Sequence, residues 1–209
     1  MIPVKVLAVR YLANTSGMLC RGLEIPEGYP SLAMITADSD DPTYIALDAA
    51  TKAADVKVVY ARSFYAGAGN ASTPHAGEVI GILAGPNPGT VRSGMDACLG
   101  MLDRVGFEEV GGVPYLAHTV SRTGSFLAKE AGVAEGDSLA YLIAPPLESM
   151  YAMDAALKAA DVKLCKLYGP PTETNFGGGL LTGTQSACEA ACAAFAQAVT
   201  AVAQQPVER

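Results

Sequence analysis

The sequence contains an internal repeat, and this feature constrains the fold more than any other. Residues 48–57 read DAATKAADVK and residues 154–163 read DAALKAADVK, so nine of ten positions are identical. Upstream, Ser31–Ala33 and Ser138–Ala140 are identical and almost equally spaced from their respective segments. Matching segments that recur in the same order indicate a duplicated structural unit rather than a chance likeness between two alanine-rich helices.

The repeat also predicts where the two copies differ in length. Residues 82–85 align with residues 180–183, an offset about eight residues shorter than that of the helical segment. The extra length of the first copy falls in the Gly/Ser/Pro-rich stretch 66–77. We therefore expect two tandem domains of similar fold, residues 1–106 and residues 107–209, a size within the usual range for domains.

Hydrophobic periodicity and turn residues predict the same order of elements in both copies. In the first copy we expect strands over 4–11, 32–37, 56–61 and 78–84, and helices over 18–24, 43–54 and 90–105. In the second copy we expect strands over 116–120, 139–144, 162–167 and 179–181, and helices over 125–131, 149–160 and 185–203. The glycine fingerprints of doubly wound nucleotide-binding folds, GxGxxG and GxxxxGK[ST], are missing from the sequence. The pattern favours an α+β fold, a small sheet with helices packed on it, built twice.

Charge and hydropathy exclude two classes of partner. The net charge is −7 and there is no run of Lys or Arg, so nonspecific binding of nucleic acid is not expected. We see no signal-peptide pattern and no apolar run near the ~18 residues of a membrane span, which predicts a cytoplasmic protein with no membrane partner. The five cysteines contain no CxxC pair, so a disulfide framework is not expected either.

Catalytic and metal-binding motifs are not found in the sequence. The two histidines, His75 and His118, form no HExxH or other metal-spaced cluster, and no GxSxG nucleophile motif occurs. Cys188 and Cys192 are four residues apart on an expected helix, where core packing is the simpler interpretation. We therefore predict that the protein is not an enzyme and uses no metal and no cofactor.

The acidic run Asp38-Ser39-Asp40-Asp41 is the strongest polar feature. Asp41 precedes a proline and is expected to cap the following helix, which leaves Asp38 and Asp40 without a structural role. Clustered carboxylates at the end of a strand are suited to a small cation or an amine. Because the second copy has Ala144–Glu148 at this place, the acidic cluster belongs to one copy only. Two alternatives follow from it, a soluble protein that binds or senses an amine and an enzyme that holds a metal at Asp38–Asp41.

Five segments of the chain resemble a known family, the EutL-like tandem-domain shell proteins of bacterial microcompartments, of the ethanolamine-utilisation type. The resemblance covers nearly the whole chain and is carried by Ala37–Ala46, Val58–Gly67, Gly85–Pro88, Val120–Ser125 and Ala144–Glu148. It implies an α+β fold of two tandem circularly permuted bacterial-microcompartment domains. Each domain would be a small antiparallel or mixed sheet with helices packed on it.

The resemblance also implies a function. Such proteins form homotrimers that mimic a hexamer, and these tiles pack with other shell proteins around metabolic enzymes. The resemblance implies gated pores in the tile that pass small metabolites such as ethanolamine. By motif position, the implied ethanolamine contacts fall on Asp40, Tyr65, Ala66 and Glu78. Two loops, 66–77 and the glycine-rich 176–179, are implied to lie at the central pore.

Overall fold

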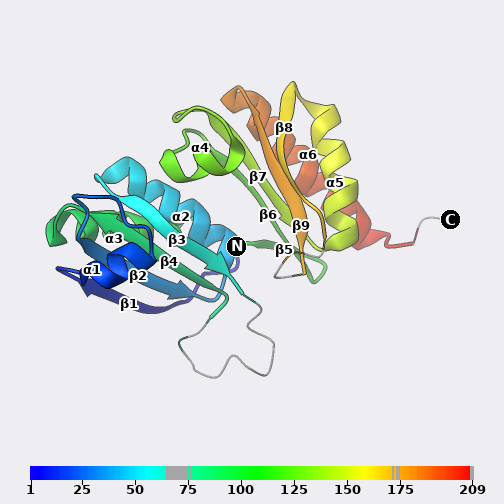
Figure 1. Cartoon of the computed structure of the whole chain (residues 1–209). Coiled ribbons are helices and arrows are strands. Elements are labelled where there is room, and N and C mark those ends of the chain that lie inside the picture. The colour runs from blue at the N-terminus through cyan, green and yellow to red at the C-terminus, as the bar shows by residue number, and fades with distance from the viewer. Residues whose placement is uncertain (65–74, 76, 171, 173–174, 208–209) are drawn as a thin grey trace. The chain divides into compact units, whose positions relative to one another are not determined.

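The computed structural model describes residues 1–64, 75, 77–170, 172 and 175–207 (Figure 1). The chain divides into two compact units. We call residues 3–105 with 124–127 the amino-terminal unit, and residues 1–2, 106–123 and 128–209 the carboxy-terminal unit. The short segment 124–127, which comes from the second copy of the repeat, thus belongs to the amino-terminal unit. The division of the two domains at residue 106 stays a prediction.

The amino-terminal unit is an antiparallel sheet with helices on both faces. Its strands are ordered β1-β2-β4-β3, and their bounds are β1 Val6–Leu12, β2 Ser31–Ala37, β3 Lys57–Ser63 and β4 Val79–Gly85. Its helices are α1 Gly17–Gly22, α2 Asp40–Ala53 and α3 Pro88–Leu102. Because side chains alternate along a strand, Ala33 and Ile35 of β2 pack with α2 and α3 in one core. Leu32 faces the other way and packs with Leu23 and Ile25, which follow α1.

Local sequence determines where α2 and α3 begin. At α3, the Asn87 side chain accepts a hydrogen bond of 2.9 Å from the Thr90 N–H, and Pro88 is the first helical residue. At α2, the prediction that Asp41 caps the helix is wrong, because the helix begins at Asp40 and Ser39 is the N-cap. Asp40 and Asp41 lie in the first turn and are buried. Acidic side chains are favoured there by the positive end of the helix dipole.

The carboxy-terminal unit repeats this architecture with one added strand. Its strands are ordered β5-β6-β7-β9-β8, and their bounds are β5 Glu108–Val110, β6 Val113–Val120, β7 Ser138–Ala144, β8 Val162–Tyr168 and β9 Gly177–Gly183. The remaining helices are α4 Ser125–Ala131, α5 Pro146–Ala159 and α6 Gln185–Gln204. Strands β6 to β9 pair in the order of β1 to β4, so the predicted duplicated α+β fold is confirmed.

The sequence did not predict β5, and it expected a loop where β9 begins. β5 is three residues long and turns into β6 at Gly111 and Gly112, which both have positive φ, as a two-residue hairpin requires. The resemblance implied a loop over residues 176–179, but residues 177–179 are buried strand residues. A Cβ at Gly178 would collide with the Leu142 carbonyl and one at Gly179 with the Lys166 carbonyl. These glycines therefore allow the backbones of three strands to approach closely.

Helix α6 is long and apolar enough, by length and composition, to cross a membrane, which the sequence interpretation did not anticipate. The apolar side of α6 packs within the carboxy-terminal unit. Cys188, Cys192, Phe195 and Val199 recur at helical spacing and are buried in the core with β7 and α5. The prediction that the two cysteines pack in the core is confirmed. In all, 33% of the apolar stretch of α6 is buried within the unit.

Candidate functional site

The acidic side chains predicted from the sequence gather at one end of β2 and β4 in the amino-terminal unit. Ala37, the last residue of β2, pairs with Val79, the first residue of β4. The Glu78 N–H donates to the Ala37 carbonyl at 2.8 Å. Because Asp38 follows one paired residue and Glu78 precedes the other, antiparallel pairing brings these two distant carboxylates to the same place. We call Asp38, Asp40 and Glu78 the acidic cluster.

Backbone contacts hold this end of the sheet in place. The Lys5 N–H donates to Asp38 Oδ1 at 2.7 Å, and the Asp38 N–H donates back to the Lys5 carbonyl at 3.2 Å. Gly77 has a φ of +65°, and a Cβ there would collide with the Ala37 carbonyl and with Leu7. Only glycine fits this position, so Gly77 sets the direction from which the chain reaches Glu78. Lys5 and Gly77 could not be predicted from the sequence, since their contacts depend on strand pairing.

The electrostatics of the acidic cluster are those of crowded carboxylates. Burial raises the pKa of Glu78, and the nearby charges of Asp40 and Asp38 raise it further. Asp40 is itself only 6% exposed, and its Oδ1 accepts a hydrogen bond of 2.9 Å from the Asp41 N–H. Negative charge is costly in such a place because burial disfavours the charged form, and a bound cation would lower that cost. The cluster is therefore suited to a small positively charged ligand.

Two further ligand-binding residues were predicted, Tyr65 and Ala66. Tyr65 and Ala66 lie outside the described residues. Phe64, just before them, donates its N–H to the Glu78 carbonyl at 2.9 Å. In the described parts of the chain, no group of three or more His, Cys, Asp or Glu side chains is placed to hold a metal ion.

The carboxy-terminal unit has apolar residues where the acidic cluster would recur. Ala144 pairs with Gly177 as Ala37 pairs with Val79. Pro145 therefore takes the place of Asp38, and Phe176 takes the place of Glu78. The Phe176 ring packs against Phe107 with ring centroids 5.6 Å apart. The equivalents of Asp38 and Glu78 in the carboxy-terminal unit therefore carry no carboxylate.

Comparison with known proteins identifies the family. Residues 31–112 match the BMC domain. The chain is 61% identical to the bacterial microcompartment shell protein EutL of Clostridium perfringens (99% of this chain, 97% of that protein). It is 49% identical to EutL of Salmonella typhimurium (100% and 97%).

Solved structures agree with this match. The crystal structure of the ethanolamine utilization protein EutL from Leptotrichia buccalis is similar with a TM-score of 0.95 and 55% identity (100% of this chain, 98% of that chain). The trimeric bacterial microcompartment shell protein PduB shares the fold with a TM-score of 0.80 and 19% identity (96% and 89%). Given identity of this level over its full length, the chain belongs to the EutL family of bacterial microcompartment shell proteins.

Proposed function

We propose that this shell protein assembles as a homotrimer and that its acidic cluster binds a small amine, with ethanolamine as the first candidate, at a pore of the tile. Three chains of two similar domains supply six similar units, the number that a hexagon-like tile needs. Closed rotational symmetry is also the common arrangement of homo-oligomers. The membership in the EutL family supports this assembly over the alternative of a soluble amine sensor.

The observation that carries the amine proposal is the meeting of Asp38, Asp40 and Glu78 at the paired ends of β2 and β4. A primary ammonium has three donors and no acceptor, and carboxylates are its strongest acceptors. We assign the ammonium to Asp40 and Glu78, with Tyr65 and Ala66 completing the site. Burial and then repulsion by Asp40 and Asp38 raise the pKa of Glu78, and a bound ammonium would offset both.

Titration calorimetry with ethanolamine tests the amine site. The wild type should bind with an affinity that falls at least tenfold, about 1.4 kcal/mol, in Asp40→Asn and in Glu78→Gln. Asp96→Asn, an exposed carboxylate on α3 of the same unit, is the matched control and should bind as the wild type does. Equal affinity in all four proteins would refute the site and leave the shell assignment intact.

Assembly is tested separately. Sedimentation should give a trimer, and electron microscopy of the concentrated protein should show sheets of tiles. A monomer at every concentration would refute the homotrimer. We further propose that the role is structural and selective rather than catalytic, and that the shell lies in the cytoplasm with its pore gated. Incubation with ethanolamine should therefore leave the amine chemically unchanged.

A further inference from the structure

The carboxylates of the acidic cluster are held by different parts of the amino-terminal sheet. Asp38 is tied to the outer strand β1, because its Oδ1 accepts the Lys5 N–H at 2.7 Å and its own N–H donates to the Lys5 carbonyl at 3.2 Å. The Glu78 backbone is tied to the other side, where its carbonyl accepts the Phe64 N–H at 2.9 Å just after β3. Strands β2 and β4 lie between β1 and β3. Asp38 is therefore fixed on one side of the cluster and Glu78 on the other.

The three carboxylates also differ in exposure. Asp40 is 6% exposed in the first turn of α2, and Glu78 is partly buried, whereas Asp38 is exposed. An oxygen of Asp38 is already used by the backbone of Lys5. The ammonium assigned to Asp40 and Glu78 therefore does not need Asp38 as a ligand. Asp38 adds its negative charge to the cluster from the β1 side.

The charged neighbours of Glu78 determine how readily it ionises. The charged and titratable residues on the described segments that meet near Glu78 are Lys5 before β1, Asp38, Asp40 and Asp41 between β2 and α2, Arg62 on β3, and His75. The basic residues of this set are exposed, and the Arg62 guanidinium lies 5.7 Å from the centroid of the Tyr60 ring. Burial raises the pKa of Glu78, and the charges of Asp40 and Asp38 raise it further. Carboxylates therefore dominate the electrostatics at Glu78.

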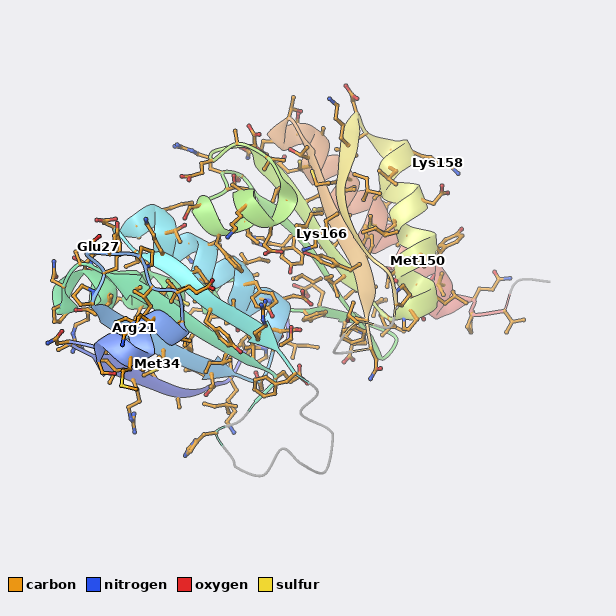
Figure 2. The ribbon with its side chains drawn as sticks, viewed as in Figure 1. Arg21, Glu27, Met34, Met150, Lys158 and Lys166 are labelled. Carbon is orange, nitrogen blue, oxygen red and sulfur yellow. The ribbon has the colours of Figure 1, made fainter. Side chains whose placement is uncertain are left out.

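The charged residues on and after α1 lie at the opposite end of the sheet. Arg21 of α1 and Glu27 of the following loop flank Leu23 and Ile25 in the sequence (Figure 2). Leu23 and Ile25 pack with Leu32, which lies near the start of β2. The acidic cluster follows the last residue of β2, so it is remote from these charges.

We infer that an amine entering the acidic cluster displaces a proton from Glu78, and that Asp38 sets the pH of this exchange without contacting the amine. The inference rests on the proposed amine site. When no cation is bound, burial and the neighbouring carboxylates favour the protonated form of Glu78. A primary ammonium, as in Lys, loses its own proton only at about pH 10, so the amine arrives with its charge.

The exchange conserves charge. The O–H bond of the Glu78 carboxyl breaks and its proton passes to solvent. The carboxylate that remains accepts an N–H of the ammonium, so one positive charge enters the site as another leaves. Amine binding is therefore pH-dependent: below the pKa of Glu78 in the free protein, the affinity falls by up to tenfold for each pH unit. The site holds the amine at higher pH and releases it in acid.

Two measurements on the full chain test the exchange. Ethanolamine hydrochloride, adjusted to the pH of a weakly buffered protein solution, is added over the range from about pH 5 to about pH 8. An indicator dye should record the release of up to one proton per chain at the acidic end and none at the upper end. Calorimetry over the same range should show an affinity that rises with pH and then levels off. Glu78→Gln should release no proton, and Asp96→Asn, an exposed position on α3, should behave as the wild type does.

Asp38→Asn tests whether Asp38 acts through its charge. The Asn side-chain carbonyl can still accept the Lys5 N–H, so this variant removes the charge and keeps the hydrogen bond. The pH at which the affinity levels off should move down by roughly half a unit, because one negative charge near Glu78 is lost. Asp38→Glu keeps the charge and should restore most of the wild-type pH profile. A merely structural role would instead lower the affinity of Asp38→Asn equally at every pH.

The possible failures have separate meanings. Ethanolamine binding with one affinity at every pH and no proton release overturns the exchange and leaves the amine site standing. Proton release with a pH profile that Asp38→Asn does not move, or an affinity that falls equally at every pH in this variant, overturns the role of Asp38. No ethanolamine binding at any pH overturns the inference and the proposed amine site together.

Discussion

Asp48 Oδ1 accepts a hydrogen bond of 2.9 Å from the backbone N–H of Leu127, a residue 79 positions further along the chain. The other oxygen, Oδ2, accepts from the Gly124 N–H and lies 3.1 Å from the Lys52 ammonium. The first N–H groups of a helix have no partner inside the helix. Gly124 precedes α4 and has no side chain with which to cap it. Asp48 of α2 therefore caps α4 instead.

Removing this cap should destabilise the protein. In Asp48→Ala, the Gly124 and Leu127 N–H groups lose their acceptor in a buried place, and we expect the free energy of unfolding to fall by about 3 kcal/mol. Asp96→Ala, on the exposed side of α3, is the matched control and should change it by less than about 0.5 kcal/mol. Urea denaturation followed by circular dichroism measures both. Equal effects of the two substitutions would contradict the capping role.

A second prediction concerns the glycine that leads to the acidic cluster. Gly77→Ala forces a Cβ against the Ala37 carbonyl at a positive φ, so it should cost about 3 kcal/mol of stability and weaken amine binding. Gly28 also has a positive φ, +84°, but a Cβ there meets nothing within 4 Å. Gly28→Ala should therefore cost only about 1 kcal/mol. Thermal melts compare the stability of Gly77→Ala with that of Gly28→Ala. An equal loss of stability in both variants would mean that the collision at Gly77 is relieved without cost.

A third prediction concerns pH. The pKa of Glu78 is raised in the folded protein above its ordinary value of 4.5 by burial and by Asp40 and Asp38. The folded state therefore holds this proton more tightly than the unfolded state, and the Glu78 contribution to stability falls as pH rises from 4.5 through the folded-state pKa. Glu78→Gln has no carboxylate to ionise at this position. The free energy of unfolding of Glu78→Gln relative to that of the wild type should therefore increase over this pH range and then level off.

Denaturation from about pH 4 to about pH 8 checks this difference. Added ethanolamine should reduce the stability difference between Glu78→Gln and the wild type at the upper end of the range. Parallel curves for the two proteins would contradict the raised pKa.

A fourth prediction concerns thiol reactivity. Burial raises the pKa of Cys98 to about 12 and that of Cys192 to about 11, and the thiolate is the reactive form. At about pH 8, a maleimide should therefore label Cys20 first, which is partly exposed, and leave Cys98 and Cys192 unlabelled until the protein unfolds. Mass spectrometry of labelled peptides identifies the order. Early labelling of Cys98 would show that the core around α3 opens in the native state.

The pattern of strands and helices was largely predictable, because hydrophobic periodicity and turn residues act locally. The expected helix over 125–131 is α4 with the same bounds. The two elements that the sequence did not predict correctly, β5 and the start of β9, also have local explanations. β5 is too short to show alternation, and the glycines of β9 resemble a loop because their role is to let neighbouring strands approach closely.

The acidic cluster was predictable only in part. Asp38 and Asp40 stand out as a run in the sequence, but their proximity to Glu78 depends on the pairing of Ala37 with Val79 across the sheet. The family resemblance implied Glu78 as a ligand, and the strand register explains only why Glu78 lies near Asp38. Lys5, which holds Asp38 through its backbone N–H, carries no signal that a sequence pattern could reveal.

The sequence by itself determined that this chain is one unit built twice, and the repeat around Asp48 and Asp154 is the plainest sign of it. It did not determine what these two aspartates do, although they lie in segments that match at nine of ten positions. Asp48 is fully buried and caps α4, whereas Asp154 is 64% exposed and pairs with Lys158 on its own helix. Local sequence sets the helix on which each aspartate lies. Only the tertiary structure decides which helix is covered, because burial depends on segments that are distant in the chain.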